Sequence, residues 1–189
     1  MDLQLTGKKA LVSAGHKGIG LFIARRLLEE GAEVSICCRQ QAELDQAIET
    51  LSALGKVEGA VCDFSNVDQI KNWVTNAGTS MGGIDICVGN ASASGQHGEG
   101  TQPWQRSFEV DILGSAMFYE AAKPFLTQSK AAAIVQIATI TAIEHHVPIS
   151  TLPSTYTVDV IGNNRTAVDA AAQAATHLGY ETTHTANIK

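Results

Sequence analysis

The sequence predicts an α/β fold with three layers, in which a doubly wound parallel sheet lies between two layers of helices. Short apolar runs alternate with longer stretches whose apolar residues recur at helical spacing, which is typical of βαβ units. A glycine cluster separates the first run from the first helical stretch. The chain has 189 residues, 44% of them hydrophobic, which predicts one domain with a substantial core.

The first unit has the pattern of a phosphate-binding turn. An apolar run at residues 10–12 leads into SAGHKGIG at residues 13–20, and a helical pattern follows at once. In such a turn, backbone N–H groups and the positive end of the helix dipole can meet a phosphate, and glycine leaves room for its close approach. The alternative is an ordinary turn between a strand and a helix.

The later elements repeat this alternation as far as residue 139. Strands are expected at residues 33–39, 57–64, 84–88 and 131–139. Helices are expected at residues 40–54, 67–75 and 104–126. Ser65 and Asn66 offer a cap for the second of these helices, and Pro124 is expected to kink or end the third. The Gly-, Ser- and Ala-rich segment 89–102 is a long loop, and such loops after strands often form the site.

Composition excludes several classes of function. The net charge of −6 argues against a nucleic-acid surface. No run approaches the roughly 18 apolar residues of a membrane helix, and the N-terminus lacks a signal pattern, so we expect a cytoplasmic protein. The four cysteines lie in apolar, strand-like runs without a CxxC pair, which predicts buried reduced thiols. The adjacent His145 and His146 would face opposite sides of an extended segment, so no metal site is expected.

Several short motifs occur in the order and at the spacing of one known family. They are SAGHKGIG at 13–20, Arg39 after the second strand, Cys62-Asp63 after the third, Gly89-Asn90-Ala91-Ser92 after the fourth, VDILG at 110–114 and VQIAT at 135–139. With these motifs, residues 5–148 resemble the short-chain dehydrogenase/reductases, whose fold is Rossmann-like. The family has TGxxxGIG in the turn and NNAG after the fourth strand, so Ala14 and Gly89 depart from its pattern.

The resemblance implies a nicotinamide dinucleotide cofactor. The glycine turn would cover the pyrophosphate and the adenine ribose, Asp63 would contact the adenine, and Asn90 and Ala91 would line the cofactor. An acidic residue closing the second strand would accept hydrogen bonds from the ribose hydroxyls of NAD. Arg39 stands there instead and would pair with a 2′-phosphate, with Lys17 as a second cation, so NADP is favoured over NAD. The alternative for Arg39 is a solvated charge. The cofactor-binding residues implied are Ser13, Gly15, Lys17, Gly18, Ile19, Gly20, Arg39, Asp63, Asn90 and Ala91.

The resemblance also implies a Ser/Tyr/Lys catalytic group, which this chain does not have intact. Thr139 falls at the serine position, and its hydroxyl could make the same hydrogen bond. Asp111 falls at the position of an assisting asparagine. Tyr156 is the candidate catalytic tyrosine, but Val160 stands where the lysine should follow, and the chain contains no YxxxK. Without a neighbouring cation, a phenol that titrates near 10 is a poor base at neutral pH.

The tail does not continue this family. A strand is expected at residues 156–162, an alanine-rich helix at 167–178 and a last strand at 180–188. Residues 156–185 resemble a segment of the glycerate 2-kinase (hydroxypyruvate reductase-like) family, so a natural fusion, a built chimera and a divergent family member are all open. The hypothesis is one domain, residues 1–189, with a dinucleotide-binding part at 1–148 and a tail at 149–189 that completes the parallel sheet.

Two functional interpretations follow. The first is an NADP(H)-dependent oxidoreductase acting on a small carbonyl or alcohol, impaired by loss of the YxxxK lysine. The second is a non-catalytic dinucleotide-binding or structural α/β domain, degenerate or engineered. Relatives commonly pair through the long helix, here residues 107–126, which makes a homodimer the expected assembly.

Overall fold

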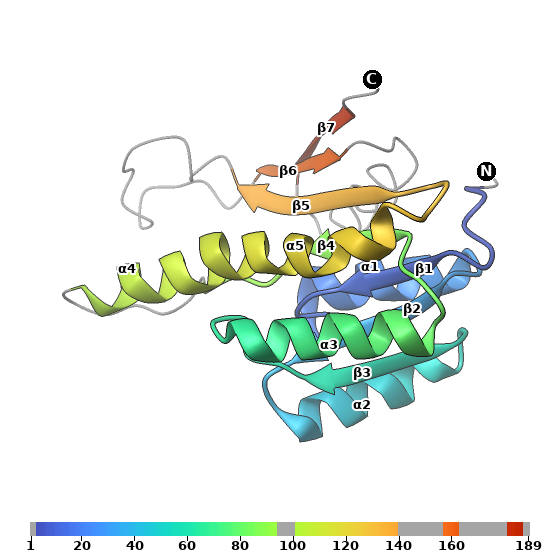
Figure 1. Ribbon diagram of the computed structural model, residues 1–189, viewed down its shortest axis with the longest axis horizontal. Helices are drawn as coiled ribbons and strands as arrows, with labels where there is room; N and C mark the ends of the chain where they lie inside the picture. The colour runs from blue at the N-terminus through green and yellow to red at the C-terminus, as the bar shows by residue number, and fades with distance from the viewer. Residues whose placement is uncertain (1–2, 94–100, 140–156, 163–180, 187–189) are drawn as a thin grey trace.

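A computed structural model describes residues 3–93, 101–139, 157–162 and 181–186. Its centre is a seven-stranded sheet in the order β3-β2-β1-β4-β5-β6-β7, with helices on both faces (Figure 1). The strands are β1 Lys9–Val12, β2 Glu33–Cys38, β3 Val57–Val61, β4 Ile86–Gly89, β5 Ala133–Thr139, β6 Thr157–Gly162 and β7 Glu181–Ala186. The helices are α1 Gly18–Glu29, α2 Gln41–Ser52, α3 Val67–Ser80, α4 Gln102–Ser107 and α5 Ser115–Leu126, with a π-helical segment, η1, at Phe108–Gly114.

The first five strands are parallel and form the predicted doubly wound sheet. Ala10 of β1 pairs with Val34 of β2 on one side and with Ile86 of β4 on the other. The chain therefore runs outward from β1 to β3 and then returns to continue at β4. The strand order reverses between β1 and β4, and ligands of such sheets bind outside the carboxyl ends of the strands at that point.

The two faces of the sheet bury separate cores, because successive side chains of a strand point to opposite faces. Ala10 and Val12 pack with the apolar faces of α1 and α2. Leu11 packs on the other face with α3 and α5. At the centre of that second core the Phe118 ring stacks on Trp73, with centroids 5.4 Å apart, and meets Phe64 edge-on at 5.6 Å. The prediction of three layers is confirmed.

The start and the buried face of helix α3 follow from its local sequence. The Asn66 side chain caps its N-terminus by accepting hydrogen bonds from the backbone N–H groups of Asp68 and Gln69, each at 3.1 Å, as predicted for this position. Ile70, Val74 and Ala77 then recur at helical spacing and are buried. The helix continues to Ser80, five residues beyond its predicted end at 75.

The predicted helix 104–126 is divided by a π-helical segment that the pattern did not indicate. Residues Phe108–Gly114 form η1 between α4 and α5, and in Figure 1 the α4 end of this run projects beyond the strands. Pro124 lies inside α5, which ends at Leu126, so the proline does not end the helix.

The tail strands extend the sheet in a different direction from the one predicted. β6 pairs with β5 in antiparallel fashion, with Thr139 opposite Val158 and Val135 opposite Gly162. β7 then pairs parallel to β6. The expectation of a continued parallel sheet was therefore wrong at β6, since an antiparallel neighbour needs only a return at the same edge and no crossover. The predicted helix 167–178 lies outside the described residues.

The four cysteines confirm the prediction of buried free thiols. Cys37, Cys38, Cys62 and Cys87 are all unpaired and buried. Within the part of the chain that the structure describes, no helix is long and apolar enough to cross a membrane. Over the same residues, no group of three or more His, Cys, Asp or Glu side chains could hold a metal ion.

Candidate functional site

A cavity of about 430 Å³ opens at the carboxyl ends of the central strands, where the strand order reverses. Its volume lies in the range of roughly 300–1,000 Å³ that small-molecule sites occupy. The lining comes from the glycine turn, the ends of β2 and β3, the start of α2, the loop after β4, and α4 with η1. These residues are Ala14, His16, Lys17, Cys37, Cys38, Arg39, Gln40, Glu43, Cys62, Asp63, Phe64, Asn90, Ala91, Ser92, Ala93, Arg106 and Val110.

The glycine turn and the loop after β4 are fastened to each other. The buried Ser13 hydroxyl accepts hydrogen bonds from the backbone N–H groups of Asn90 and Ala91, at 2.8 and 2.9 Å, and donates to the Val88 carbonyl at 3.3 Å. The Asn90 amide donates to the carbonyls of Ser13 and Ala14 at 3.1 and 3.3 Å. Ser13 therefore lies beneath the cavity and shapes it, whereas Asn90 and Ala91 line it.

The turn itself is tight. Ala14, at the position of the family's first glycine, has φ +50°, a left-handed conformation that favours glycine. Gly20 approaches both Ala14 and Asn90 so closely that a Cβ there would lie 3.1 Å from the Ala14 carbonyl carbon and closer still to its oxygen. A Cβ on Gly15 would lie 2.6 Å from the Ile36 side chain. Gly15 and Gly20 thus keep the turn compact. Gly15, Gly18, Ile19 and Gly20 are not among the residues that line the cavity.

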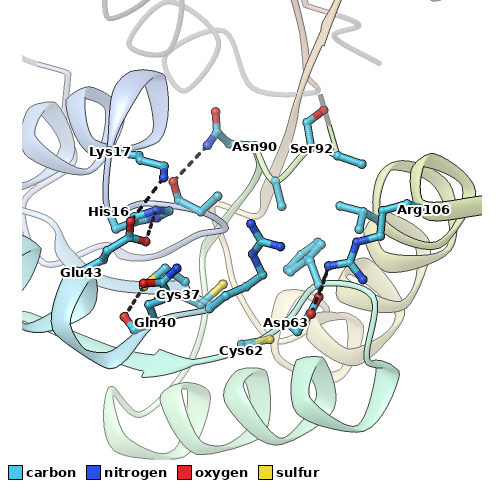
Figure 2. A pocket seen from close by; sticks show the side chains of 17 residues that line it. His16, Lys17, Cys37, Gln40, Glu43, Cys62, Asp63, Asn90, Ser92 and Arg106 are labelled. Carbon is cyan, nitrogen blue, oxygen red and sulfur yellow. Dashed lines mark hydrogen bonds and ion pairs between the residues drawn. The ribbon is translucent and has the colours of Figure 1, made fainter. Parts of the chain in front are cut away.

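One side of the cavity carries a cluster of charged and polar groups. The Glu43 carboxylate lies 3.2 Å from His16 Nε2 and 3.5 Å from Lys17 Nζ (Figure 2). Burial lowers the pKa of His16, the nearby Lys17 and Arg39 lower it further, and Glu43 opposes them. His16 is therefore neutral at pH 7. Arg39 is exposed and forms no hydrogen bond or ion pair with the described residues.

The opposite side of the cavity holds Asp63 (Figure 2). Arg106 donates to both oxygens of its carboxylate, at 3.0 and 3.1 Å, and to the Ser65 hydroxyl. Ser65 donates to Asp63 through its backbone N–H and its hydroxyl, at 2.9 and 2.8 Å. Burial alone would raise the pKa of Asp63, but the hydrogen bonds from Ser65 and Arg106 outweigh it and hold the pKa below its ordinary value. Asp63 is therefore a fixed anion.

The predicted catalytic residues are placed less completely. Thr139 is the last residue of β5. Tyr156 lies outside the described residues. Asp111, at the position of the family's asparagine, accepts a hydrogen bond from the Ala93 backbone N–H at 2.8 Å. This carboxylate holds the loop after β4 against η1, which is a structural contact.

Among the cavity's residues, sequence reasoning missed three whose side chains form ion pairs there: His16, Glu43 and Arg106. Glu43 stands in the first turn of α2, and that acidic position just after Arg39 was the available signal. Arg106 had no comparable signal, because it is 43 residues from Asp63 in the sequence. His16 lies in the turn before α1 and Glu43 lies in α2, so this contact joins residues from two different strand-helix units.

The fold and the position of this cavity are typical of dinucleotide-binding α/β proteins. Comparison with known proteins identifies the family. The family model for short chain dehydrogenases matches residues 8–152, and the chain belongs to this family. Isoepoxydon dehydrogenase from Penicillium expansum is 32% identical over 135 residues, which are 69% of this chain and 52% of that protein. Human dehydrogenase/reductase SDR family member 4 is 33% identical over 143 residues, 73% of this chain and 51% of that protein. The chain thus spans about half the length of these relatives.

Solved structures agree with this assignment. A short chain dehydrogenase from Mycobacterium smegmatis matches with a TM-score of 0.71 and 29% identity, covering 77% of this chain and 63% of that one. A metagenomic short-chain oxidoreductase, solved in complex with NADP, matches with a TM-score of 0.68 and 26% identity, covering 76% of this chain and 67% of that one.

Proposed function

We propose that this chain binds NADP(H) in the cavity at the carboxyl ends of β1 to β4 and belongs to an oxidoreductase that acts on a small carbonyl or alcohol. The observation that carries the proposal is the convergence of the glycine turn, Arg39, Asp63 and Asn90 on one cavity. A structural neighbour of the same family was solved with NADP, which supports the choice of cofactor.

The residues present fit the adenosine end of such a cofactor. Gly20 lies close to Ala14, and Lys17, the N-cap of α1, gives no side-chain hydrogen bond to the first turn of that helix. The N–H groups of that turn would hold the pyrophosphate. Arg39 would pair with a 2′-phosphate. Asp63 Oδ2 accepts only from Arg106 among the described residues, so it would accept from the adenine amino group.

The reaction that the cofactor supplies when bound is hydride transfer between its nicotinamide ring and a carbonyl carbon. Thr139, at the end of β5, would steady the substrate oxygen and Tyr156 would handle the proton. We infer that turnover is impaired, because Val160 stands where a lysine would lower the tyrosine pKa. The second candidate, a dinucleotide-binding domain without turnover, is favoured by Asp111, whose carboxylate is engaged by Ala93.

The test is a titration of the purified chain with NADPH and NADH, followed by nicotinamide fluorescence, and then an absorbance assay with a panel of ketones. We expect tighter binding of NADPH than of NADH. Arg39→Asp should shift the preference toward NADH, whereas Lys71→Asp, which makes the same charge change on the exposed face of α3, should not. An unchanged preference in Arg39→Asp would refute the 2′-phosphate assignment. Binding without oxidation across the panel would favour the second candidate.

We also propose a homodimer. Trp104, Phe108 and Ile112 recur every four residues along α4 and η1, and they are 71%, 56% and 61% exposed. Large apolar side chains that gather on one helix face are typical of protein interfaces. Sedimentation should give a dimer, and Trp104→Ala with Phe108→Ala should give a monomer; a monomeric wild-type chain would refute the proposal.

The remaining hypotheses rest on the sequence. We infer that residues 1–148 form the nucleotide-binding part and 149–189 a tail, which the pairing of β6 with β5 supports. The family match ends at residue 152, so the likeness of residues 156–185 to the glycerate 2-kinase family stays a prediction. The cytoplasmic location and the absence of a metal site also stay predictions.

A further inference from the structure

One corner of the cavity holds a carboxylate among side chains that would otherwise be suited to an anion. It lies where the turn before α1 meets the first turn of α2. Glu43 Oε1 is 3.5 Å from Lys17 Nζ, and Glu43 Oε2 is 3.2 Å from His16 Nε2. Arg39 lines the same cavity. The corner therefore combines two cationic side chains, Lys17 and Arg39, with one carboxylate, that of Glu43.

The contact with Glu43 makes Lys17 and Arg39 unequal in what they can offer a ligand. Lys17 Nζ is already opposite a carboxylate, although its side chain is 70% exposed and free to move. Arg39 has no ion-pair partner among the described residues. His16 adds no third cation at pH 7, because burial lowers its pKa, and its Nδ1 is buried with no hydrogen-bond partner in the described part of the chain. The net charge offered by the corner is thus that of Arg39 alone.

We propose that Glu43 is a specificity-determining residue for the adenine ribose, which reduces the preference for a 2′-phosphate over a 2′-hydroxyl by neutralising Lys17. The proposal rests on the proposed binding of a nicotinamide dinucleotide in this cavity. A 2′-phosphate that enters this corner carries two negative charges, so it is repelled by Glu43 and must compete with it for Lys17. A 2′-hydroxyl meets neither cost.

Removing the charge of Glu43 should therefore favour the phosphorylated ribose selectively. In Glu43→Gln the shape of the side chain is kept, Lys17 is released, and the repulsion of the phosphate disappears. The groups are partly exposed, so water screens them, and the expected gain in affinity for a 2′-phosphate is about threefold to tenfold. The affinity for an unphosphorylated ribose should change by less than about twofold.

The experiment uses calorimetric titration with two probes that lack nicotinamide, adenosine 2′,5′-bisphosphate and adenosine 5′-monophosphate. The control is Glu49→Gln, which makes the same change at an exposed position of α2 that does not line the cavity. A double-mutant cycle with Lys17→Gln isolates the role of the lysine. Lys17→Gln alone should lower bisphosphate affinity by less than about twofold, and in the Glu43→Gln background it should reduce the gain to the part that comes from relief of the direct repulsion by Glu43.

The outcomes separate this inference from the proposed function. A ratio of the two affinities that rises in Glu43→Gln and stays constant in Glu49→Gln supports the inference. If the wild-type chain binds both probes and Glu43→Gln leaves the ratio unchanged, the inference fails while the proposed function stands. If the gain is as large in the double variant as in Glu43→Gln alone, the neutralisation of Lys17 is wrong. If the wild-type chain binds neither probe, the proposed function and the inference both fail.

Discussion

Replacing Gly20 with alanine should destabilise the fold and weaken nucleotide binding through one local clash. The added Cβ would lie 2.5 Å from Asn90 Nδ2, 3.1 Å from the Ala14 carbonyl carbon, and closer still to the Ala14 oxygen. Two of these atoms belong to the Ala14 backbone, which cannot move away cheaply. The amide of Asn90 would have to release the carbonyls of Ser13 and Ala14.

The magnitude follows from two contributions. Overpacking of this kind costs about 1–3 kcal/mol, and each hydrogen bond lost by Asn90 contributes about 0.5–1.5 kcal/mol. With two hydrogen bonds lost, we therefore expect Gly20→Ala to lower the free energy of unfolding by about 2–6 kcal/mol. Asn90 lines the cavity, so nucleotide affinity should fall as well.

Gly18→Ala is the matched control within the same turn. A Cβ at Gly18 would meet nothing within 4 Å, so its cost comes from the positive φ of +55° alone. That conformation costs alanine about 1–2 kcal/mol, partly offset by the lower entropy of the unfolded chain. Urea denaturation of both variants measures the difference, and nicotinamide fluorescence measures the affinity. If Gly20→Ala is as stable as Gly18→Ala, the clash does not exist and the description of the turn is wrong.

Three further predictions test the core, the Asp63 site and a buried hydrogen bond. Phe118→Ala should cost about 3–5 kcal/mol in urea denaturation, because the ring is fully buried against Trp73 and Phe64, whereas Val61→Ala, 44% exposed, should cost under about 1 kcal/mol; equal costs would refute the assigned core. Asp63→Asn should cost about 1 kcal/mol at pH 7, since the ion pair with Arg106 is partly exposed and screened. The pKa of Asp63 is lowered by folding, so its stabilisation is present above its unfolded value near 3.9 and is lost as the pH falls through the folded pKa; a gap between wild type and variant that stays constant from pH 7 to pH 2 would contradict this. Tyr119→Phe should cost about 1–2 kcal/mol by calorimetry, because its hydroxyl donates to Gln136 Oε1 in a partly buried contact, and a neutral effect would show that water replaces the bond.

Much of the fold could be predicted from local pattern. Helical spacing of Val67, Ile70 and Val74, together with the cap at Asn66, was enough to place the start of α3. The π-helical segment at Phe108–Gly114 escaped prediction, because a change of helical register leaves no distinct mark in a mostly apolar stretch. The direction of β6 escaped it for another reason, since a strand has the same pattern whether it runs parallel or antiparallel to its neighbour.

The candidate site, too, could be predicted from the sequence only in part. The glycine turn could be named from its own pattern, and Arg39, Asp63 and Asn90 from the resemblance to the family. All of them follow the ends of strands, and parallel strands bring these ends together. The partners of these residues could not. Arg106 reaches Asp63 across the fold, and Ser13 turns inward to hold Asn90 and Ala91.

The sequence by itself determined the order of strands and helices, the glycine turn that begins α1, and the cation that closes β2, because periodicity and turn chemistry are local properties of the chain. The tertiary structure alone decided which charges face one another. It placed Glu43 against Lys17 and His16, and Arg106 against Asp63, on opposite sides of one cavity (Figure 2). The physical reason is that Coulombic and hydrogen-bond energies depend on distance in space, which the sheet order and the packing of α2 and α4 set.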